Sequence, residues 1–182
     1  MIFRIKKDKM LKHQRRFWDM PNRIVLLIGG YGSGKTYIGA LKSLYMSYLN
    51  APVPGMYISP SHQLATKTII ITLKELCNRA GIDYTYNQQR SEFIFHNWGG
   101  KIWLGSGDKP DSLRGPNIGW AVIDEPFIQK REVFEQMIAR VRHPEAKKSQ
   151  IFLTGTPEQL NWGFTLANDP DLDIGIIQAS TL

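Results

Sequence analysis

The chain has 182 residues, of which 42% are hydrophobic and 21% are charged, values typical of a globular protein rather than a disordered one. No apolar run approaches the ~20 residues that a membrane-spanning helix needs, and no signal-peptide core follows the basic residues near the N-terminus. The single cysteine, Cys77, excludes an internal disulfide framework and a cysteine-built zinc site, which favours a reducing, cytosolic setting.

The formal net charge is +7, and most of the excess lies in a basic N-terminal arm over about 1–23. This arm carries eight basic and two acidic side chains, a net charge of +6; the basic ones are Arg4, Lys6, Lys7, Lys9, Lys12, Arg15, Arg16 and Arg23. A second basic group lies around Pro144 and consists of Arg140, Arg142, Lys147 and Lys148. Such segments bind nucleic acid or another acidic surface, but a solvated protein face explains them equally well.

Apolar strands alternate with helices along the first half of the chain. The run 24–28 is apolar and rich in branched residues, which predicts a buried parallel strand. A glycine-rich loop follows, and then a helix over 36–48 whose buried side carries Ile38, Leu41, Leu44, Tyr45 and Leu49. We expect a second strand over 56–59 and a helix from about 60 to 80 that ends at Gly81.

The second half continues the same alternation. The segments 93–95 and 101–104 flank "HNWGG" and predict a hairpin, and 108–117 predicts a polar loop. Strands are expected over 120–123 and 151–154, with a helix over 131–141 between them and a further strand over 174–178. This order predicts an α/β fold of one domain over 1–182, with a mostly parallel sheet flanked by helices on both faces.

The strongest motif is the loop between the first strand and the first helix. Its sequence fits G-x-x-x-x-G-K-[ST] and consists of Gly29, Gly30, Tyr31, Gly32, Ser33, Gly34, Lys35 and Thr36. Glycines let successive backbone N–H groups turn toward anionic oxygens, and the helix start adds the positive end of its dipole. We expect Lys35 to reach the β- and γ-phosphates of a nucleotide and the Thr36 hydroxyl to ligate Mg²⁺.

A second motif is the buried strand that ends in Asp124 and Glu125. Asp124 is expected to hold hydrated Mg²⁺, and Glu125 to polarise a water for attack on the γ-phosphate. Acids at strand ends are often caps, so the pair gains its meaning from the phosphate loop upstream. An adjacent glutamate base favours an ATPase of the catalytic-glutamate type over a switch GTPase or a nucleoside kinase.

Two weaker signals lie on either side of these motifs. Thr154 and Thr156 end a strand and could hydrogen-bond the γ-phosphate or the attacking water, although a simple strand-to-turn stop is equally consistent. The Gln14 amide could pair with N6 and N7 of adenine, and Phe17 or Trp18 could stack on the base. A structural aromatic anchor remains the preferred interpretation for this segment.

Taken together, the motifs resemble the ATPase domain of the large terminase subunits of tailed bacteriophages. The resemblance runs from about residue 10 onward and rests on the order of six motifs. They are Gln14-x-x-Phe17, the loop 29–36, Pro60-Ser-x-Gln63, Ser112-Leu-Arg-Gly115, Trp120-Ala-Val-Ile-Asp-Glu125 and Leu153-Thr-Gly-Thr-Pro157. It implies an additional-strand P-loop NTPase fold, in which the strand at 151–154 lies between the strands carrying the phosphate loop and Asp124.

The resemblance also implies roles for individual residues. Gln14 matches the adenine-reading glutamine, Lys35 and Thr36 the Walker A residues, Asp124 and Glu125 the Walker B pair, and Thr154 to Thr156 the coupling motif. Such motors work as rings in which an arginine from one subunit completes the neighbour's site. Arg140 and Arg142 are the candidates, with Arg114 third; alternatively they are surface charges or contact DNA. Many terminases carry an arginine inside the phosphate loop, where this chain has Tyr31 and Ser33.

The function implied is Mg²⁺-dependent ATP hydrolysis that drives double-stranded DNA into a procapsid, in the cytoplasm of an infected bacterium. The implied partners are DNA, further copies of the chain, a portal and a small terminase subunit. No nuclease activity is expected from these residues, because the chain ends at Leu182. The alternatives are a helicase or remodelling ATPase, although a second RecA-like domain is missing, and a module that binds ATP or DNA with little turnover.

Overall fold

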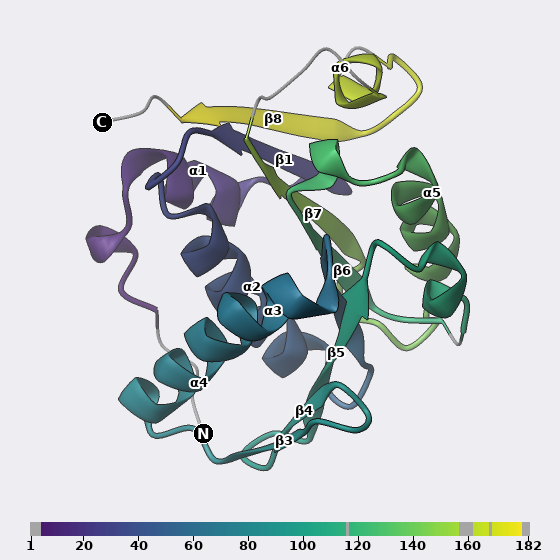
Figure 1. The fold of residues 1–182 in the computed structure, drawn as a ribbon. Helices are drawn as coiled ribbons and strands as arrows, with labels where there is room; N and C mark the ends of the chain where they lie inside the picture. Colours follow the sequence, from purple (N-terminus) through teal and green to yellow (C-terminus); the bar gives the residue numbers. More distant parts are fainter. Residues whose placement is uncertain (1–4, 116, 157–161, 168, 180–182) are drawn as a thin grey trace.

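A computed structural model describes residues 5–115, 117–156, 162–167 and 169–179, so Arg4 and Pro157 lie outside the described residues. Within this part, eight strands form one sheet in the order β3-β4-β5-β2-β6-β7-β1-β8 (Figure 1). The strands are β1 (Ile24–Gly29), β2 (Gly55–Ser59), β3 (Tyr84–Asn87), β4 (Glu92–Phe95), β5 (Gly100–Ser106), β6 (Trp120–Asp124), β7 (Gln150–Gly155) and β8 (Ile174–Ala179).

Most of the sheet is parallel, as predicted. The parallel part consists of β5, β2, β6, β7, β1 and β8. β3 and β4 are antiparallel and lie at the outer end of the strand order, next to β5. β7 lies between β6 and β1, which confirms the inserted strand that the resemblance implies. The carboxyl ends of the parallel strands therefore meet at one edge of the sheet, where open α/β sheets bind their ligands.

Helices cover both faces of this sheet (Figure 1). The helices are α1 (Lys12–Asp19), α2 (Lys35–Asn50), α3 (His62–Lys67), α4 (Ile69–Ala80), α5 (Arg131–Arg140) and α6 (Trp162–Ala167), with short 3₁₀ turns η1 (Lys7–Lys9), η2 (Pro110–Leu113) and η3 (Pro126–Ile128). α1 to α4 lie on one face, and α5 and α6 on the other. Among the described residues, no helix is long and apolar enough to cross a membrane.

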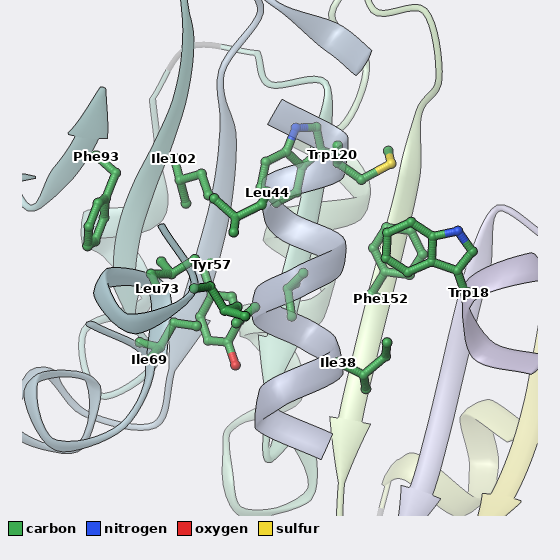
Figure 2. Packing of buried hydrophobic residues seen from close by; sticks show 14 of the residues in the cluster. Trp18, Ile38, Leu44, Tyr57, Ile69, Leu73, Phe93, Ile102, Trp120 and Phe152 are labelled. Atoms are coloured by element: carbon green, nitrogen blue, oxygen red, sulfur yellow. The ribbon is translucent and has the colours of Figure 1, made fainter. Parts of the chain in front are cut away.

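Two apolar clusters hold these layers together, and alternate residues of each strand feed one or the other. Val25 and Leu27 of β1 face α1 and α2, whereas Ile24 and Leu26 face the side of α5 and α6. The first cluster includes the side chains that Figure 2 shows around α2. Its fully buried aromatic members include Phe17, Tyr57, Trp120 and Phe152.

Several predicted elements need correction. The helix expected from 60 to 80 is two helices, α3 and α4, because Thr68 leaves helical geometry at φ −124° and ψ −84°. The sequence TIII at this point is entirely β-branched, which weakens helix propensity there. The loop 108–117 contains η2, and α1 and β3 were not predicted.

The predicted buried side of α2 was also incomplete. Ile38 and Leu44 are buried, but Leu41, Tyr45 and Leu49 are only half-buried. Lys42 is almost fully buried instead, because α1 packs over this part of the helix. The described part of the basic N-terminal arm also packs on the rest of the domain, because α1 places Phe17 and Trp18 in the core.

Candidate nucleotide-binding site

The glycine-rich loop connects the carboxyl end of β1 to the start of α2. Gly32 and Gly34 have φ of 76° and 75°, in the left-handed region that favours glycine, and Gly34 is the N-cap residue of α2. Within the described chain no side chain caps α2, so the N–H groups of its first turn are directed into the loop. This arrangement attracts phosphate through aligned amide dipoles.

Lys35 connects this loop to the second motif. Its Nζ donates hydrogen bonds to the carbonyl oxygens of Gly29 at 2.8 Å and Gly30 at 3.0 Å. The same Nζ lies 3.8 Å from Glu125 Oε1, and the side chain is buried. The ammonium group therefore lies between the phosphate loop and the glutamate, while Thr36 follows it in the first turn of α2.

Tyr31 and Ser33 occupy the loop positions where an arginine was considered. Tyr31 is 80% exposed, and its ring centroid lies 6.0 Å from Lys35 Nζ. The Ser33 hydroxyl is buried and donates to the Gly30 carbonyl at 2.8 Å, which closes the loop on itself. Neither position supplies a guanidinium.

Asp124 ends β6 and is buried beside the phosphate loop. The sheet register pairs it with Thr154 of β7, whose Oγ1 donates to Asp124 Oδ1 at 2.8 Å. The pKa of Asp124 is raised to about 6, mainly by burial and in smaller part by the charge of Glu125, while the Thr154 hydrogen bond and Lys35 oppose the rise. A divalent cation at this carboxylate would remove much of the cost of ionising it.

Two residues beside Asp124 escaped the sequence analysis. Gln129 Nε2 donates to the Asp124 carbonyl at 2.6 Å and holds the end of β6 against η3. Tyr57 lies on the neighbouring strand β2 and is fully buried, and burial followed by the Asp124 charge raises the pKa of its hydroxyl. The available signal was the alternation of β2, which places Tyr57 on the same sheet face as Val122 and therefore Asp124.

Glu125 adopts a conformation that non-glycine residues rarely take, with φ 47° and ψ 56°. The following Pro126 further restricts the backbone, so surrounding contacts must hold this conformation. Its N–H donates to the Thr154 carbonyl at 2.7 Å. Its carboxylate accepts from Thr156, from the backbone N–H at Oε2 at 2.8 Å and from Oγ1 at Oε1 at 3.0 Å. The strained turn thus directs a carboxylate toward Lys35.

The two threonines therefore divide between the two acids. Thr154 bonds Asp124, which follows from the parallel pairing of β6 with β7, and Thr156 bonds Glu125 just beyond the end of that pairing. The structure brings this predicted coupling segment to the predicted Walker B pair. The contacts recorded for both hydroxyls are to protein carboxylates.

α1 places Gln14 against the phosphate loop. Gln14 is buried; its Nε2 donates to the Gly34 carbonyl at 3.3 Å and its Oε1 accepts from Leu11 N at 3.1 Å. His13, which the sequence analysis did not select, contacts the Ser33 carbonyl through Nε2 at 2.8 Å. Phe17 is fully buried edge-on to Phe152, which makes it the structural anchor rather than an exposed stacking ring.

A family model described as "Terminase large subunit, T4likevirus-type, N-terminal" matches residues 26–170, which contain the phosphate loop, Asp124, Glu125, Thr154 and Thr156 but not α1. The chain belongs to this terminase family. The PBSX phage terminase large subunit of Bacillus subtilis (strain 168) is 30% identical over 141 residues, covering 76% of this chain and 32% of that protein. The terminase chain thus spans about a third of that curated relative.

Solved structures show the same fold at low identity. The large terminase of a thermophilic bacteriophage matches with a TM-score of 0.77 and 13% identity, over 92% of this chain and 45% of that chain. The large terminase ATPase domain of Thermus phage P74-26 matches with a TM-score of 0.70 and 16% identity, over 94% and 81%. The N-terminal domain of the DNA packaging ATPase from bacteriophage phi29 matches at 0.63 and 15%, over 87% and 91%. The terminase fold is therefore the predicted P-loop NTPase fold.

Two of the predicted terminase arginines lie far from the phosphate loop. Arg140 ends α5 and Arg142 follows it, and Val141 between them bridges to Ile118, before the amino end of β6. Asp124 is six residues beyond Ile118, which at ~3.3 Å per residue places the carboxylates ~20 Å away along the strand. Neither arginine lies at the nucleotide-binding edge of its own subunit.

Both arginines are also bound to backbone or side chains in their own subunit. Arg140 Nη1 donates to the Gly115 carbonyl, and Arg142 Nε donates to Asn117 Oδ1 at 3.0 Å. Arg114, the third candidate, pairs with the exposed Asp111 and has a 60% exposed side chain. A role in catalysis for Arg140 or Arg142 would require the site of a neighbouring copy of the chain.

Proposed function

We propose that this chain hydrolyses Mg²⁺-ATP to drive double-stranded DNA into a viral procapsid, as the ATPase part of a terminase large subunit. The observation that carries the proposal is the convergence of Lys35, Asp124 and Glu125 at one edge of the sheet. The nucleotide assignment is supported by the large terminase of the thermophilic bacteriophage, which has been solved with ADP and with ATP-gamma-S. The packaging assignment is supported by the family and by the phi29 protein, described as a DNA packaging ATPase.

The residues present fit a metal-bound nucleotide. The loop 29–36 offers backbone N–H groups and the Lys35 ammonium to phosphate oxygens, and Gln14 lies where the loop meets α1. Thr36 and Asp124 would hold Mg²⁺, with phosphate and water oxygens completing its shell, as Mg²⁺ prefers. When bound, Mg²⁺-ATP supplies the γ-phosphoryl group and the positive charge that stabilises its oxygens.

Glu125 is the group that this site offers as a general base. Thr156 holds both carboxylate oxygens by donated hydrogen bonds, which fixes their direction while leaving lone pairs free to accept a proton from a water. Lys35 at 3.8 Å keeps the carboxylate beside the phosphate loop. The strained turn at Glu125 positions the base before nucleotide arrives, which reduces reorganisation during the reaction.

Thr154 and Thr156 are proposed to report the state of the site to the rest of the subunit. Each hydroxyl donates its one proton to a carboxylate and keeps lone pairs that can accept from a water, so a bond to a phosphate oxygen would require it to release the carboxylate. Because both lie at the end of β7, a change in either contact acts on the strand that carries the segment after Gly155. This is the physical content of the coupling role that the resemblance implies.

A ring of subunits is proposed to complete the site. Arg140 and Arg142 lie too far from the phosphate loop of their own chain to serve it, so a catalytic role is open to them only in trans, and Arg114 stays the third candidate. A guanidinium at developing phosphoryl charge raises rates by ~10³–10⁵ in related enzymes. The packaging role also implies a portal and a small terminase subunit as partners, and the cytoplasm of the infected bacterium as the location.

Replacing Gln14 by alanine is expected to raise the KM for ATP ~10-fold and to reduce the preference for ATP over GTP, with a smaller change in kcat. The contacts with Leu11 and Gly34 fix the amide so that Oε1 and the second N–H of Nε2 face the same way. This orientation suits adenine N6 and N7, whereas guanine O6 would meet Oε1. ATP and GTP hydrolysis rates measure it, with Gln89→Ala as an exposed control. An unchanged ratio of ATP to GTP hydrolysis rates would show that Gln14 does not recognise the base and serves only to hold α1 against the phosphate loop.

The proposed function is tested by ATPase rate against protein concentration, with and without duplex DNA. Specific activity is expected to rise with concentration, because the subunits must assemble before a trans arginine acts. Lys35→Ala subunits, which cannot turn over, are then mixed with Arg114→Ala, Arg140→Ala or Arg142→Ala subunits to identify the arginine that acts in trans. A subunit that lacks the trans arginine still receives one from a neighbouring Lys35→Ala subunit. Mixing therefore restores activity only for the variant in which the trans arginine was replaced. Turnover at background in every condition would contradict the ATPase assignment for this domain.

A further inference from the structure

The amino ends of β1 and β7 border a hollow that the nucleotide site does not use. Its volume is about 460 Å³, and it lies at the edge of the sheet opposite the phosphate loop. Three segments distant in sequence form most of its walls, 21–23 before β1, 141–143 after α5, and 148–150 at the start of β7, and Asp173 before β8 adds to them. None of its lining residues is Phe, Tyr or Trp.

Three cationic side chains line the hollow without a carboxylate partner. Among the described residues, Arg23, Arg142 and Lys148 form no ion pair, and Arg142 bonds only the neutral Asn117. The carboxylate in the lining, Asp173, already accepts hydrogen bonds from the Arg23 backbone N–H and the Asn22 side chain. The hollow therefore keeps a net positive charge directed at solvent.

Two buried amides hold the walls in place. Gln150 is 1% exposed, and its Nε2 lies within 3.3 Å of the carbonyl oxygens of Met20, Pro21 and Asn22. Asn50, also 1% exposed, donates to the Lys148 carbonyl at 3.2 Å and accepts from Lys148 N at 3.0 Å. The backbone around Arg23 and Lys148 is thus fixed before a ligand arrives, which lowers the entropic cost of binding.

We propose that this hollow binds the sugar–phosphate backbone of double-stranded DNA, with Arg23, Arg142 and Lys148 neutralising successive phosphates. This rests on the proposed function, in which DNA is the cargo. Unpaired cations without an aromatic platform suit phosphates rather than stacked bases, and phosphate contacts do not depend on sequence. The separation of ~20 Å from the carboxylates lets DNA and nucleotide bind together.

The test is binding of a short fluorescein-labelled DNA duplex, measured by anisotropy over a range of salt concentrations. The double variant Arg23→Gln/Lys148→Gln is expected to bind ~10-fold more weakly, with the slope of log K against log salt reduced by ~2. The matched control Lys67→Gln/Arg79→Gln removes the same charge from exposed positions on α3 and α4. It should bind like the wild type, and basal ATPase rate without DNA should be unchanged in both variants.

The outcomes separate this inference from the proposed function. If the wild type binds duplex with a steep salt slope and Arg23→Gln/Lys148→Gln retains that slope, the hollow is not the DNA surface, while packaging stands. If that slope disappears only when Lys6, Lys7, Lys9 and Lys12 are replaced by glutamine, the N-terminal segment is the contact instead. A wild type that does not bind duplex overturns the inference together with the DNA part of the proposed function. A melting temperature of the double variant equal to that of the wild type would exclude misfolding as the cause of weaker binding. Each single variant should show half of the change in salt slope.

Discussion

Replacing Glu125 by glutamine is expected to leave ATP bound and to lower its hydrolysis by ~10²–10⁴-fold, the usual contribution of a general base. Glutamine keeps the shape of the side chain, and its amide can still accept from Thr156 N and donate to Thr156 Oγ1. What is lost is the capacity to take a proton from water. Single-turnover hydrolysis gives the rate, and the rise in melting temperature with added ATP gives the binding.

The control for this variant is Glu135→Gln on α5, which removes an exposed carboxylate that pairs only with Arg131. Its hydrolysis should match that of the wild type. Thr156→Val provides a second comparison, because it keeps Glu125 but removes the hydroxyl that orients Oε1. We expect an intermediate loss in kcat with little change in KM. Hydrolysis by Glu125→Gln at the wild-type rate would remove Glu125 from the mechanism and leave another group as base.

The strand pattern and the phosphate loop were predictable because their information is local. Buried parallel strands need continuous apolar runs, and a phosphate loop needs glycines at fixed places, so short segments such as 24–36 determine both. α1 was missed because its sequence, KHQRRFWD, is dense in charge and only Phe17 and Trp18 carry its apolar side. The break at Thr68 depends on α3 packing on β2 and β5 while α4 packs on α2.

The internal arrangement of the site was less accessible, because it depends on which strands become neighbours. Thr154 meets Asp124 only because β7 is inserted beside β6 in one particular register. Arg142 follows α5, the helix after Asp124 and Glu125 in sequence. It nevertheless lies at the side of the sheet opposite the phosphate loop, because α5 runs back along the sheet. Nothing in the spacing of residues 124–142 shows how far that helix carries the chain from the nucleotide. A sequence motif thus predicts chemistry better than it predicts the relative positions of two motifs.

The stability of the protein is expected to rise by about 1.5 kcal/mol between pH 7 and pH 8.5 through Lys42 alone, at up to about 1.4 kcal/mol per pH unit. Burial, reinforced by the charge of Lys148, lowers the pKa of Lys42 from 10.5 to about 7. The folded protein therefore binds fewer protons than the unfolded chain between pH 7 and 10.5, so unfolding becomes less favourable as pH rises through this window. Below pH 7 both states are protonated and the effect levels off.

The contacts of Lys42 explain why the fold tolerates this cost. Its Nζ donates to the Trp18 carbonyl at the end of α1 at 2.8 Å and lies 4.7 Å from the Trp18 ring centroid and 5.0 Å from that of Phe152. A neutral amine keeps the hydrogen bond, and an ammonium gains the two aromatic faces. Lys42 thereby fastens α1, whose other end holds Gln14 against Gly34, to the helix that follows the phosphate loop.

Lys42→Met tests this account by denaturant unfolding at a series of pH values. Methionine fills similar space and cannot titrate, so the variant should lack the Lys42 slope, and the two stability curves should diverge with rising pH in favour of the wild type. Burial also raises the pKa of Cys77 to about 12, so its thiol stays protonated in the folded protein while the unfolded chain ionises at higher pH. That effect lowers stability as pH rises, but it is common to both proteins and cancels in their difference. Lys109→Met, an exposed control, should run parallel to the wild type, whereas parallel curves for Lys42→Met would show that the Lys42 amine titrates as it does in water.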